Sequence, residues 1–390
     1  MKTNPDFTFY MPVEIIFGEG RVADIGRLVS RYGKKAMLVT TPLIDPKWWP
    51  YKKIISSLES DDVSVVVFDK IKPNPTVDVI DMGAALARQE GVEVIIGFGG
   101  GSSMDAAKGI AVGATHPGSI WDYNLSSDIQ PGNKTLPIIA VGTTAGTGAQ
   151  ITSGAVITNA KMAFKSGVVG RVISPKACIV DPEITYSMPP HLTATTGFDA
   201  FSHVFESFIH ETNNILIDRF SLEAIRIVAE NLPIVVKDGA NKLARRMMAM
   251  ADTLGGICIE NVGTTLFHSM GMAIGGHFPH VSHGEALIAV YPSVLDFSWQ
   301  FCKDRFAAVA RIFDPALANE SDDDAARLLS GCVEKFLELI GTSISLTDLN
   351  IAEQDLDGLT DATLKYTHLG AHPVVPTKRQ IRSIFQNALT

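Results

Sequence analysis

The feature that most restricts the fold of this chain is an apolar strand that runs directly into three consecutive glycines. Residues 92–98 (VEVIIGF) form the strand, Gly99, Gly100 and Gly101 follow, and MDAAKGIAVGA continues as a helix-forming segment. A buried strand, a glycine turn and a helix in this order are typical of an open α/β sheet covered by helices on both faces. The ligand site of such a sheet lies at the carboxyl ends of its strands.

Similar apolar runs indicate further strands of the same sheet. They occupy residues 34–40, 63–68 and 136–141, after a β-like opening over 7–17, and helical stretches separate them. From about residue 189 the pattern becomes helical, with periodicity over 193–209, 218–231, 241–259 and 321–340. Because Pro189 and Pro190 interrupt any regular element, we predict an α/β domain over residues 1–187 and a helical domain over 188–390.

The glycine turn predicts a cradle for a dinucleotide. Glycines let the backbone approach a ligand, and the N–H groups at a helix start attract an anion such as a pyrophosphate. Here the turn is Gly99, Gly100, Gly101 and Ser102. The spacing is not G-x-G-x-x-G, so a tight turn without a ligand is the alternative interpretation.

Two other strand ends carry polar residues that could hold the rest of the cofactor. The loop GTTAGTG after residue 141 offers the hydroxyls of Thr143, Thr144 and Thr147 for ribose and nicotinamide, although it could be only a turn. Thr41 stands where an NAD-specific site would place an acid for the ribose 2′-OH. Without that negative charge, NADP is permitted beside NAD.

An acid and three histidines form a candidate metal site. Asp199 and His203 are four residues apart in an apolar run, so a helix would place them on one face. His268 and His283 come from a later segment and would complete a four-ligand set for zinc or ferrous iron. The alternative is that Asp199 caps a turn and His203 is a hydrogen-bonded core histidine.

The segment between these two later histidines carries two more. His277 and His280 could line a substrate cleft, transfer protons, or lie on the surface.

Charge and cysteine content exclude several classes of protein. The net charge of −9, without a basic run, argues against a nucleic-acid partner. The four cysteines are widely spaced, which favours a reducing cytoplasm over a disulfide framework. No secretory signal and no apolar run of membrane-spanning length is visible, so we expect a soluble cytoplasmic protein.

Four motifs in order, GGGSSMDAAKG, TTAGTG, GFDAFSHVFE and HSMGMAIGGHFPHVSHGEA, resemble those of the iron-containing (group III) alcohol dehydrogenase family. The resemblance spans nearly the whole chain. It implies a dehydroquinate-synthase-like fold, with a Rossmann-like N-terminal domain, an all-helical C-terminal domain and an active site in the cleft between them. It also implies a homodimer or larger homo-oligomer.

The resemblance extends to individual positions. The residues that match the family's metal ligands are Asp199, His203, His268 and His283. Those that match cofactor contacts are Gly99, Gly100, Gly101, Ser102, Asp105, Thr143, Thr144, Thr147 and Lys165.

The chain also departs from the family pattern. Met272 replaces a histidine found near the nicotinamide in many members, and Ala149-Gln150 replaces Ser-Glu. Thr41 replaces an aspartate of many NAD-preferring members, which favours NADP. The interval from His268 to His283 is one residue longer than usual, which makes His280 a fallback ligand.

The resemblance implies reversible hydride transfer between a small primary alcohol or diol and NAD or NADP, with Fe²⁺, or alternatively Zn²⁺, in the metal site. With Met272 in the relay position, we expect the proton to leave through His277, water or the cofactor ribose. An apolar cleft is predicted from Phe198, Phe201, Phe205, Phe267, Met270 and Met272. The alternatives are a glycerol dehydrogenase-like or dehydroquinate synthase-like enzyme, or a nonenzymatic nucleotide-binding regulator.

Overall fold

The chain folds into two compact units, each with its own core. In the computed structural model, which describes residues 4–42 and 47–390, Met11–Ser187 form an α/β unit. Met188–Thr390, together with residues 4–10, form a helical unit. No helix in these described ranges is both long enough and apolar enough to cross a membrane.

The α/β unit contains a parallel sheet in the order β1-β8-β5-β4-β2-β3. Its strands are β1 (Glu14–Phe17), β2 (Lys35–Val39), β3 (Ser64–Phe68), β4 (Val94–Gly99), β5 (Ile138–Gly142) and β8 (Ala177–Val180). The strands expected at residues 34–40, 63–68, 92–98 and 136–141 are confirmed to within two residues at each end, as β2, β3, β4 and β5. The opening strand is much shorter than the β-like run, because only its last four residues pair with β8.

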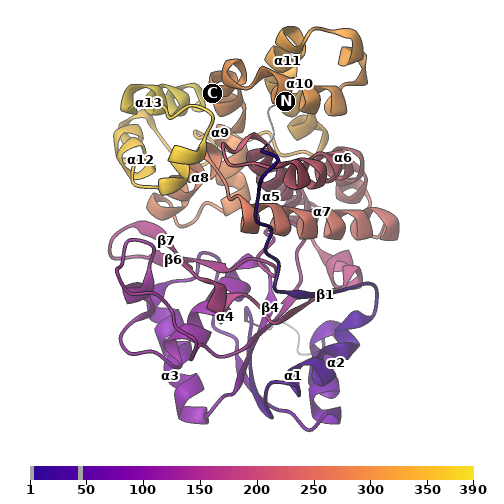
Figure 1. Ribbon diagram of the computed structural model, residues 1–390, viewed down its shortest axis with the longest axis vertical. Helices are drawn as coiled ribbons and strands as arrows, with labels where there is room; N and C mark the ends of the chain where they lie inside the picture. Colours follow the sequence, from indigo (N-terminus) through magenta and orange to yellow (C-terminus); the bar gives the residue numbers. More distant parts are fainter. Residues whose placement is uncertain (1–3, 43–46) are drawn as a thin grey trace. The chain divides into compact units, whose positions relative to one another are not determined.

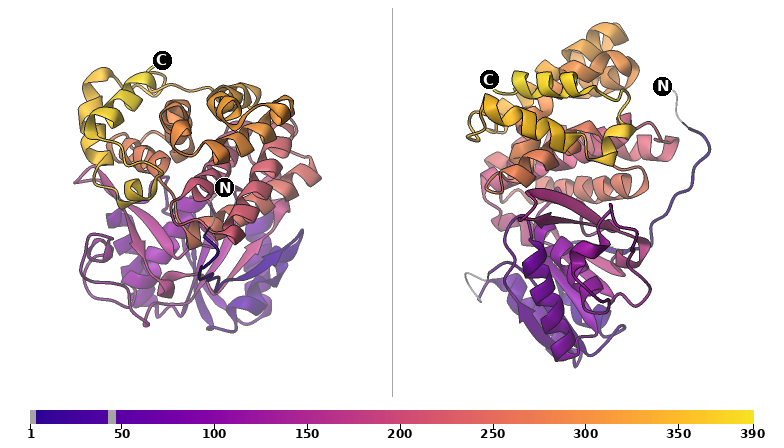
Figure 2. Two further views of the ribbon diagram at one scale, coloured as in Figure 1. Left: turned by 45° about the horizontal axis from the view of Figure 1, so that its top comes forward. Right: turned by 90° about the vertical axis from the view of Figure 1, so that its left-hand side faces the viewer.

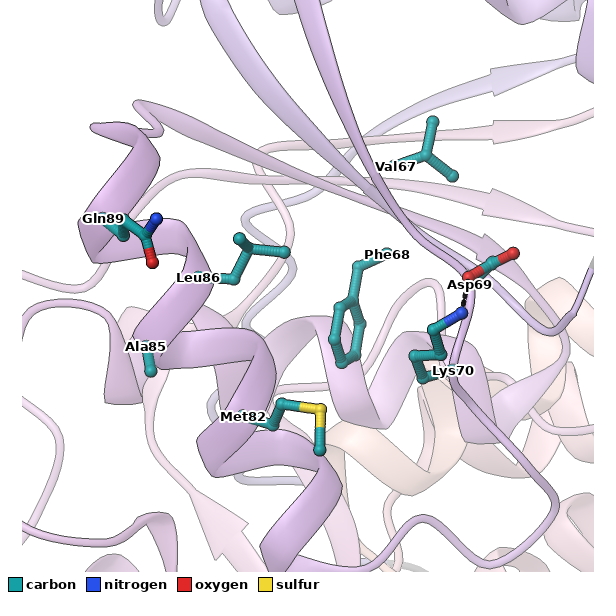
Figure 3. Close-up of a pocket in the computed structure, with 8 residues that line it drawn as sticks. All are labelled: Val67, Phe68, Asp69, Lys70, Met82, Ala85, Leu86 and Gln89. Atoms are coloured by element: carbon teal, nitrogen blue, oxygen red, sulfur yellow. Dashed lines mark ion pairs between the residues drawn. The ribbon is translucent and has the colours of Figure 1, made fainter.

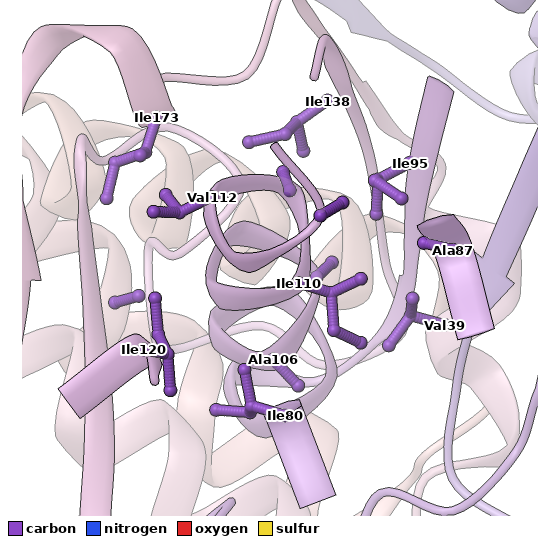
Figure 4. Packing of buried hydrophobic residues seen from close by; sticks show 14 of the residues in the cluster. Val39, Ile80, Ala87, Ile95, Ala106, Ile110, Val112, Ile120, Ile138 and Ile173 are labelled. Atoms are coloured by element: carbon purple, nitrogen blue, oxygen red, sulfur yellow. The ribbon is translucent and has the colours of Figure 1, made fainter. Parts of the chain in front are cut away.

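Helices cover both faces of this sheet. Figure 1 shows α3 (Val77–Glu90) and α4 (Gly101–Gly113) on one side of the sheet, and Val39 and Ile95 lie in the core on that side (Figure 4). Leu38 and Ile96 face the opposite core, under α1 (Ile25–Val29) and α2 (Trp49–Ser60). Strands buried on both sides need apolar residues at successive positions, which explains their continuous apolar sequence.

A two-stranded antiparallel hairpin, which the sequence analysis did not predict, lies beside α4. It consists of β6 (Gly154–Asn159) and β7 (Phe164–Val169), with Thr158 opposite Lys165. The hairpin thereby fixes the position of Lys165.

The helical unit is assembled around α5, which packs against α6, α7 and α9. Its α-helices are α5 (Pro190–Ile209), α6 (Ile215–Lys237), α7 (Lys242–Asn261), α8 (Leu266–His277), α9 (His283–Ser298), α10 (Lys303–Phe313), α11 (Asp322–Leu339), α12 (Leu356–Thr363) and α13 (Lys378–Asn387). Figure 2 shows the two C-terminal helices, α12 and α13, packed against the rest of this unit, where they contact α8 and α9.

Residues 4–10 belong to the helical unit, whereas the sequence analysis placed them in the α/β domain. The Tyr10 backbone N–H donates to Asn261 Oδ1 at 2.8 Å, and the Phe9 ring packs edge-on against Phe220. These contacts are with α7 and α6, and no local sequence pattern specifies them.

Candidate active site

Three helices bring one carboxylate and three imidazoles together. Asp199 and His203 lie one turn apart on α5, while His268 is in the first turn of α8 and His283 begins α9. Asp199 Oδ1 lies 3.6 Å from His203 Nε2, 3.6 Å from His268 Nε2 and 3.7 Å from His283 Nε2. A tetrahedral ion with bonds of about 2.1 Å separates its ligands by about 3.4 Å. The ligand atoms of Asp199, His268 and His283 all lie within 4.8 Å of one another, so these three fit a single shared ion. His203 lies outside this mutual set, although it is equally close to Asp199.

Two atoms of this cluster lack hydrogen-bond partners among the described residues. Asp199 Oδ1 and His268 Nε2 are buried and unpaired, yet they are 3.6 Å apart, too far for a hydrogen bond. A cation between them would satisfy both atoms. Three imidazoles and a carboxylate suit iron or zinc, so the donor chemistry also fits a metal of the expected kind.

The start of α9 explains how His283 reaches α5. Ser282 and Glu285 form a reciprocal capping box that fixes the first turn. Gly284, the residue after His283, cannot be replaced by a residue with a side chain without a clash, because a Cβ there would lie 2.5 Å from Thr195 O of α5. Gly284 therefore permits the close helix approach that places His283 beside Asp199.

The electrostatics of the cluster keep Asp199 ionised. Burial opposes its ionisation, but the nearby His203, His283 and His268 outweigh burial and lower the pKa of the carboxyl. For His268, burial favours the neutral ring, while Glu206 and Asp199 raise its pKa. Asp199, His203 and His268 are buried, whereas His283 is partly exposed.

Glu206 is a residue of this centre that the sequence analysis did not single out. It is fully buried on α5, and His268 Nδ1 contacts its Oε1. Positions 199, 203 and 206 have the i, i+4, i+7 spacing of one helix face. That spacing was the signal that could have identified it.

The predicted apolar cleft is wrong for most of its residues. Phe198, Phe201, Phe205 and Phe267 have no exposed surface, and their rings pack around Tyr291. Met270 is also fully buried, and Met272 is 6% exposed. These side chains form the core behind the metal ligands, because α5 is enclosed by its neighbours, and they carry no information on substrate polarity.

The two remaining histidines of the segment make other contacts. His277, the last residue of α8, is nine residues from His268, which is about 14 Å along a helix. Its Nδ1 contacts Ala273 O, and a Cβ on Gly358 of α12 would lie 3.9 Å from its Nε2. His280 is exposed, and its Nε2 contacts Leu349 O at 3.3 Å.

The two predicted cofactor loops lie side by side in the α/β unit. The Thr143 N–H donates to Gly99 O at 2.9 Å, and a Cβ on Gly101 would lie 3.0 Å from Thr147 Cγ2. Likewise, a Cβ on Gly100 would lie 3.1 Å from Thr144 Oγ1. Loop packing therefore favours glycine here, because a Cβ would be tight against both threonine side chains. In addition, no side chain caps the first turn of α4, which leaves that turn suited to an anion.

Asp105 and Lys165 lie together behind these loops. Asp105 accepts a hydrogen bond from the Val156 N–H of the hairpin, and Lys165 Nζ donates to Asn74 Oδ1 at 2.6 Å. Burial raises the pKa of Asp105 to about 6 and lowers that of Lys165 to about 8. A second lysine, Lys108, is also buried, and its Nζ donates to Gly154 O.

Thr41 lies exposed just after β2, next to the end of β3, since the Ile71 N–H donates to Thr40 O. Asp69 and Lys70 at that end form an ion pair at 2.8 Å and help to line a groove between β3 and α3 (Figure 3). Because β3 is an edge strand two positions from β4, this groove is separate from the loops after β4 and β5.

Comparisons with known proteins agree with both halves of this description. Residues 12–182 match the family model described as iron-containing alcohol dehydrogenase, and residues 193–389 match the C-terminal model of the same family. The chain is 36% identical to choline dehydrogenase of Bacillus subtilis over 82% of this chain and 80% of that protein. It is 29% identical to NAD-dependent methanol dehydrogenase of Bacillus methanolicus, over 98% and 99% of the two chains.

A solved structure shares the whole fold. The alcohol dehydrogenase of a halo-thermophilic archaeon from a Red Sea brine pool superposes with a TM-score of 0.94, at 34% identity, with both chains fully covered.

Proposed function

The chain belongs to the iron-containing alcohol dehydrogenase family, and from this premise we propose that it interconverts a small primary alcohol or diol and its aldehyde with NAD or NADP. The chemistry is an oxidoreductase reaction in which the nicotinamide accepts or gives the hydride. Relatives of this chain are alcohol dehydrogenases, which supports this reading over a dehydroquinate synthase-like cyclisation or a nonenzymatic regulator.

The observation that carries the proposal is the unpaired Asp199 Oδ1 facing three imidazole nitrogens at 3.6 to 3.7 Å. Asp199, His203, His268 and His283 would hold Fe²⁺, or alternatively Zn²⁺. When bound, such an ion polarises the substrate oxygen and lowers the pKa of the hydroxyl. The four side chains would hold the ion in place, and the aromatic core behind them would exclude water from one side.

The α/β unit would bind the cofactor. We assign the pyrophosphate to Gly99, Gly100, Gly101 and Ser102 at the uncapped start of α4, with Asp105 behind them. Thr143, Thr144 and Thr147 would contact the nicotinamide half, and Lys165 would add a positive charge. Because Thr41 places no negative charge near the ribose, NADP should be accepted as well as NAD.

His277 is retained as a candidate proton carrier. Its separation from His268 of about 14 Å along α8 means that transfer would need intervening water or the cofactor ribose. Substituting His277 by Ala should change the pH–rate profile, and an unchanged profile would remove this role.

One experiment tests the function as a whole. Protein purified without air is analysed for its elements and then assayed with a panel of small aldehydes, using NADH and NADPH in parallel. Bound iron or zinc together with steady nicotinamide oxidation is expected. Cofactor binding without turnover on any aldehyde would instead favour the regulator.

We further propose a homo-oligomer, a dimer or larger, acting in the cytoplasm. No disulfide joins the cysteines among the described residues, which suits a reducing compartment. Light scattering coupled to size-exclusion chromatography measures the mass directly, and a monomer across the concentration range would reject the oligomer.

A further inference from the structure

The carboxylate of Glu206 is saturated with hydrogen bonds although it is fully buried. Oε1 accepts from Ser202 Oγ at 2.9 Å and contacts His268 Nδ1. Oε2 accepts from the Thr265 backbone N–H at 2.6 Å, from Thr265 Oγ1 at 3.0 Å and from the His268 N–H at 3.3 Å. Two oxygens offer about four acceptor sites, so this carboxylate has no capacity left and acts only as an acceptor.

Two of these donors belong to the same histidine. Since Glu206 has no proton to give, the His268 ring must donate from Nδ1, and its Nε2 is then the atom that carries the lone pair when the ring is neutral. That Nε2 is the buried, unpaired nitrogen 3.6 Å from Asp199 Oδ1. One carboxylate therefore fixes the backbone start of α8 and the orientation of the ring that α8 presents.

Glu206 also completes a charge balance. Asp199 and Glu206 are both buried, and the three imidazoles between and around them are neutral when they act as ligands. Two carboxylates offset the charge of a divalent cation, whereas one would leave a net buried charge, which is costly.

A further layer holds the carboxylate itself. Thr265 Oγ1, which donates to Glu206, lies 3.2 Å from Nδ1 of the fully buried His372. His372 Nε2 contacts Ser298 Oγ of α9 at 2.9 Å. The orientation of Glu206 is thus tied to α8, α9 and the segment before α13.

We infer that Glu206 is a positioning residue of the metal centre, which directs His268 Nε2 at the ion and supplies the second negative charge for a dication. This inference rests on the metal site of the proposed function. A purely structural reading is that Glu206 only caps α8, because Oε2 accepts from two backbone N–H groups at the helix start. The two readings differ in what they predict for the ion.

The test compares metal affinity in matched variants, by competition with a chromophoric chelator, and the absorption of the Co²⁺-loaded proteins. Glu206→Gln keeps the shape but removes the charge. Asp181→Asn is its control, since Asp181 is another buried carboxylate that accepts backbone N–H bonds, from Val22 and Glu183. We expect Glu206→Gln to bind Co²⁺ and Zn²⁺ about 10- to 100-fold more weakly, with shifted Co²⁺ bands, and Asp181→Asn to match the wild type.

Equal affinity and an unshifted Co²⁺ spectrum in Glu206→Gln would overturn the inference while leaving the proposed function intact. If wild-type protein binds metal no better than His268→Ala, the metal site and this inference fall together. If Glu206→Gln does not fold, the metal affinity of Thr265→Val is measured instead, with Thr265→Ser as its control. Loss of the hydroxyl donor should weaken metal binding about fivefold, and equal affinities of these two variants would overturn the role of Glu206.

Discussion

The candidate sites of the two units are built from different kinds of chemical group. The α/β unit buries apolar residues on both faces of its sheet, and its candidate cofactor site consists mainly of backbone and hydroxyl groups in loops. The helical unit carries charged side chains inside its core, among them Asp199, Glu206 and the Arg305–Asp218 ion pair. The first site should therefore be sensitive to added volume, and the second to lost charge.

The largest expected effect is loss of a metal ligand. His268→Ala removes one donor of the cluster, so metal content should fall below detection and turnover should drop about a thousandfold, since the ion contributes several kcal/mol to the transition state. Elemental analysis and aldehyde reduction measure both. His280→Ala, from the same segment but exposed, should keep its metal, and metal loss there would instead support it as the fallback ligand.

A buried and an exposed ion pair of nearly equal length should contribute very differently to the free energy of unfolding. Arg305 Nη1 lies 2.6 Å from Asp218 Oδ1 with both side chains at most 7% exposed, whereas Arg31 and Glu14 of the α/β unit are 2.7 Å apart and at least 43% exposed. Arg305→Met should cost about 3–5 kcal/mol of unfolding free energy, because Asp218 is left buried and unpaired. Arg31→Met should cost less than about 1 kcal/mol by urea denaturation, and similar losses would contradict the contrast.

Replacing a glycine by alanine should lower stability and metal affinity only where that glycine lies in a close contact between two helices. A Cβ at Gly284 meets the backbone of Thr195, so Gly284→Ala should cost about 1–3 kcal/mol and weaken metal binding by moving His283. Gly331 in α11 has nothing within 4 Å of its Cβ position. Thermal denaturation should show Gly331→Ala as stable as the wild type or slightly more so, and metal affinity unchanged in both variants would refute the role of Gly284.

The cofactor loops should respond to volume without losing metal. Gly101→Ala places a methyl group 3.0 Å from Thr147 Cγ2, which pushes the two loops apart. We expect the KM for the dinucleotide to rise about tenfold, which corresponds to about 1.4 kcal/mol, with normal metal content. Steady-state kinetics and elemental analysis separate this outcome from general unfolding. Unfolding would lower the turnover number and the metal content together.

The smallest effect concerns pH and cofactor affinity. Burial lowers the pKa of Lys165 to about 8, so the side chain is cationic below that pH and neutral above it. The KM for the anionic dinucleotide should rise a few-fold as pH increases through 8, and Lys165→Met should remove this dependence. Lys161→Met, at an exposed position on the hairpin turn, is the control and should retain it.

Local pattern was sufficient for much of this molecule. Continuous apolar runs located β2, β4 and β5, because strands buried on both faces cannot alternate. A similar run located the edge strand β3, although that strand is only partly buried. The pair Asp199 and His203 was recognisable from helical spacing. The hairpin β6–β7 was missed, although residues 160–163 separate two short segments that contain β-branched residues.

Burial was the main source of error. The phenylalanines of α5 looked like cleft residues because they flank Asp199 and His203 in the sequence. In a helix enclosed on several sides, residues that are neighbours in sequence point in different directions. Asp199 and His203 therefore face His268 and His283, while the phenylalanines beside them in the sequence point into the core. Residues 4–10 show the same limit, since their assignment depends on Asn261 and Phe220, more than 200 positions away.

The sequence by itself determined the parallel strands, the glycine turn before α4 and the identity of the donor atoms for a metal, because each depends on periodicity or on side-chain chemistry. The tertiary structure decided which donors converge, which glycines are required by packing, and that Glu206 belongs to the centre. These outcomes depend on contacts between α5, α8 and α9, and a distance such as the 3.7 Å from Asp199 to His283 exists only after the helices have packed.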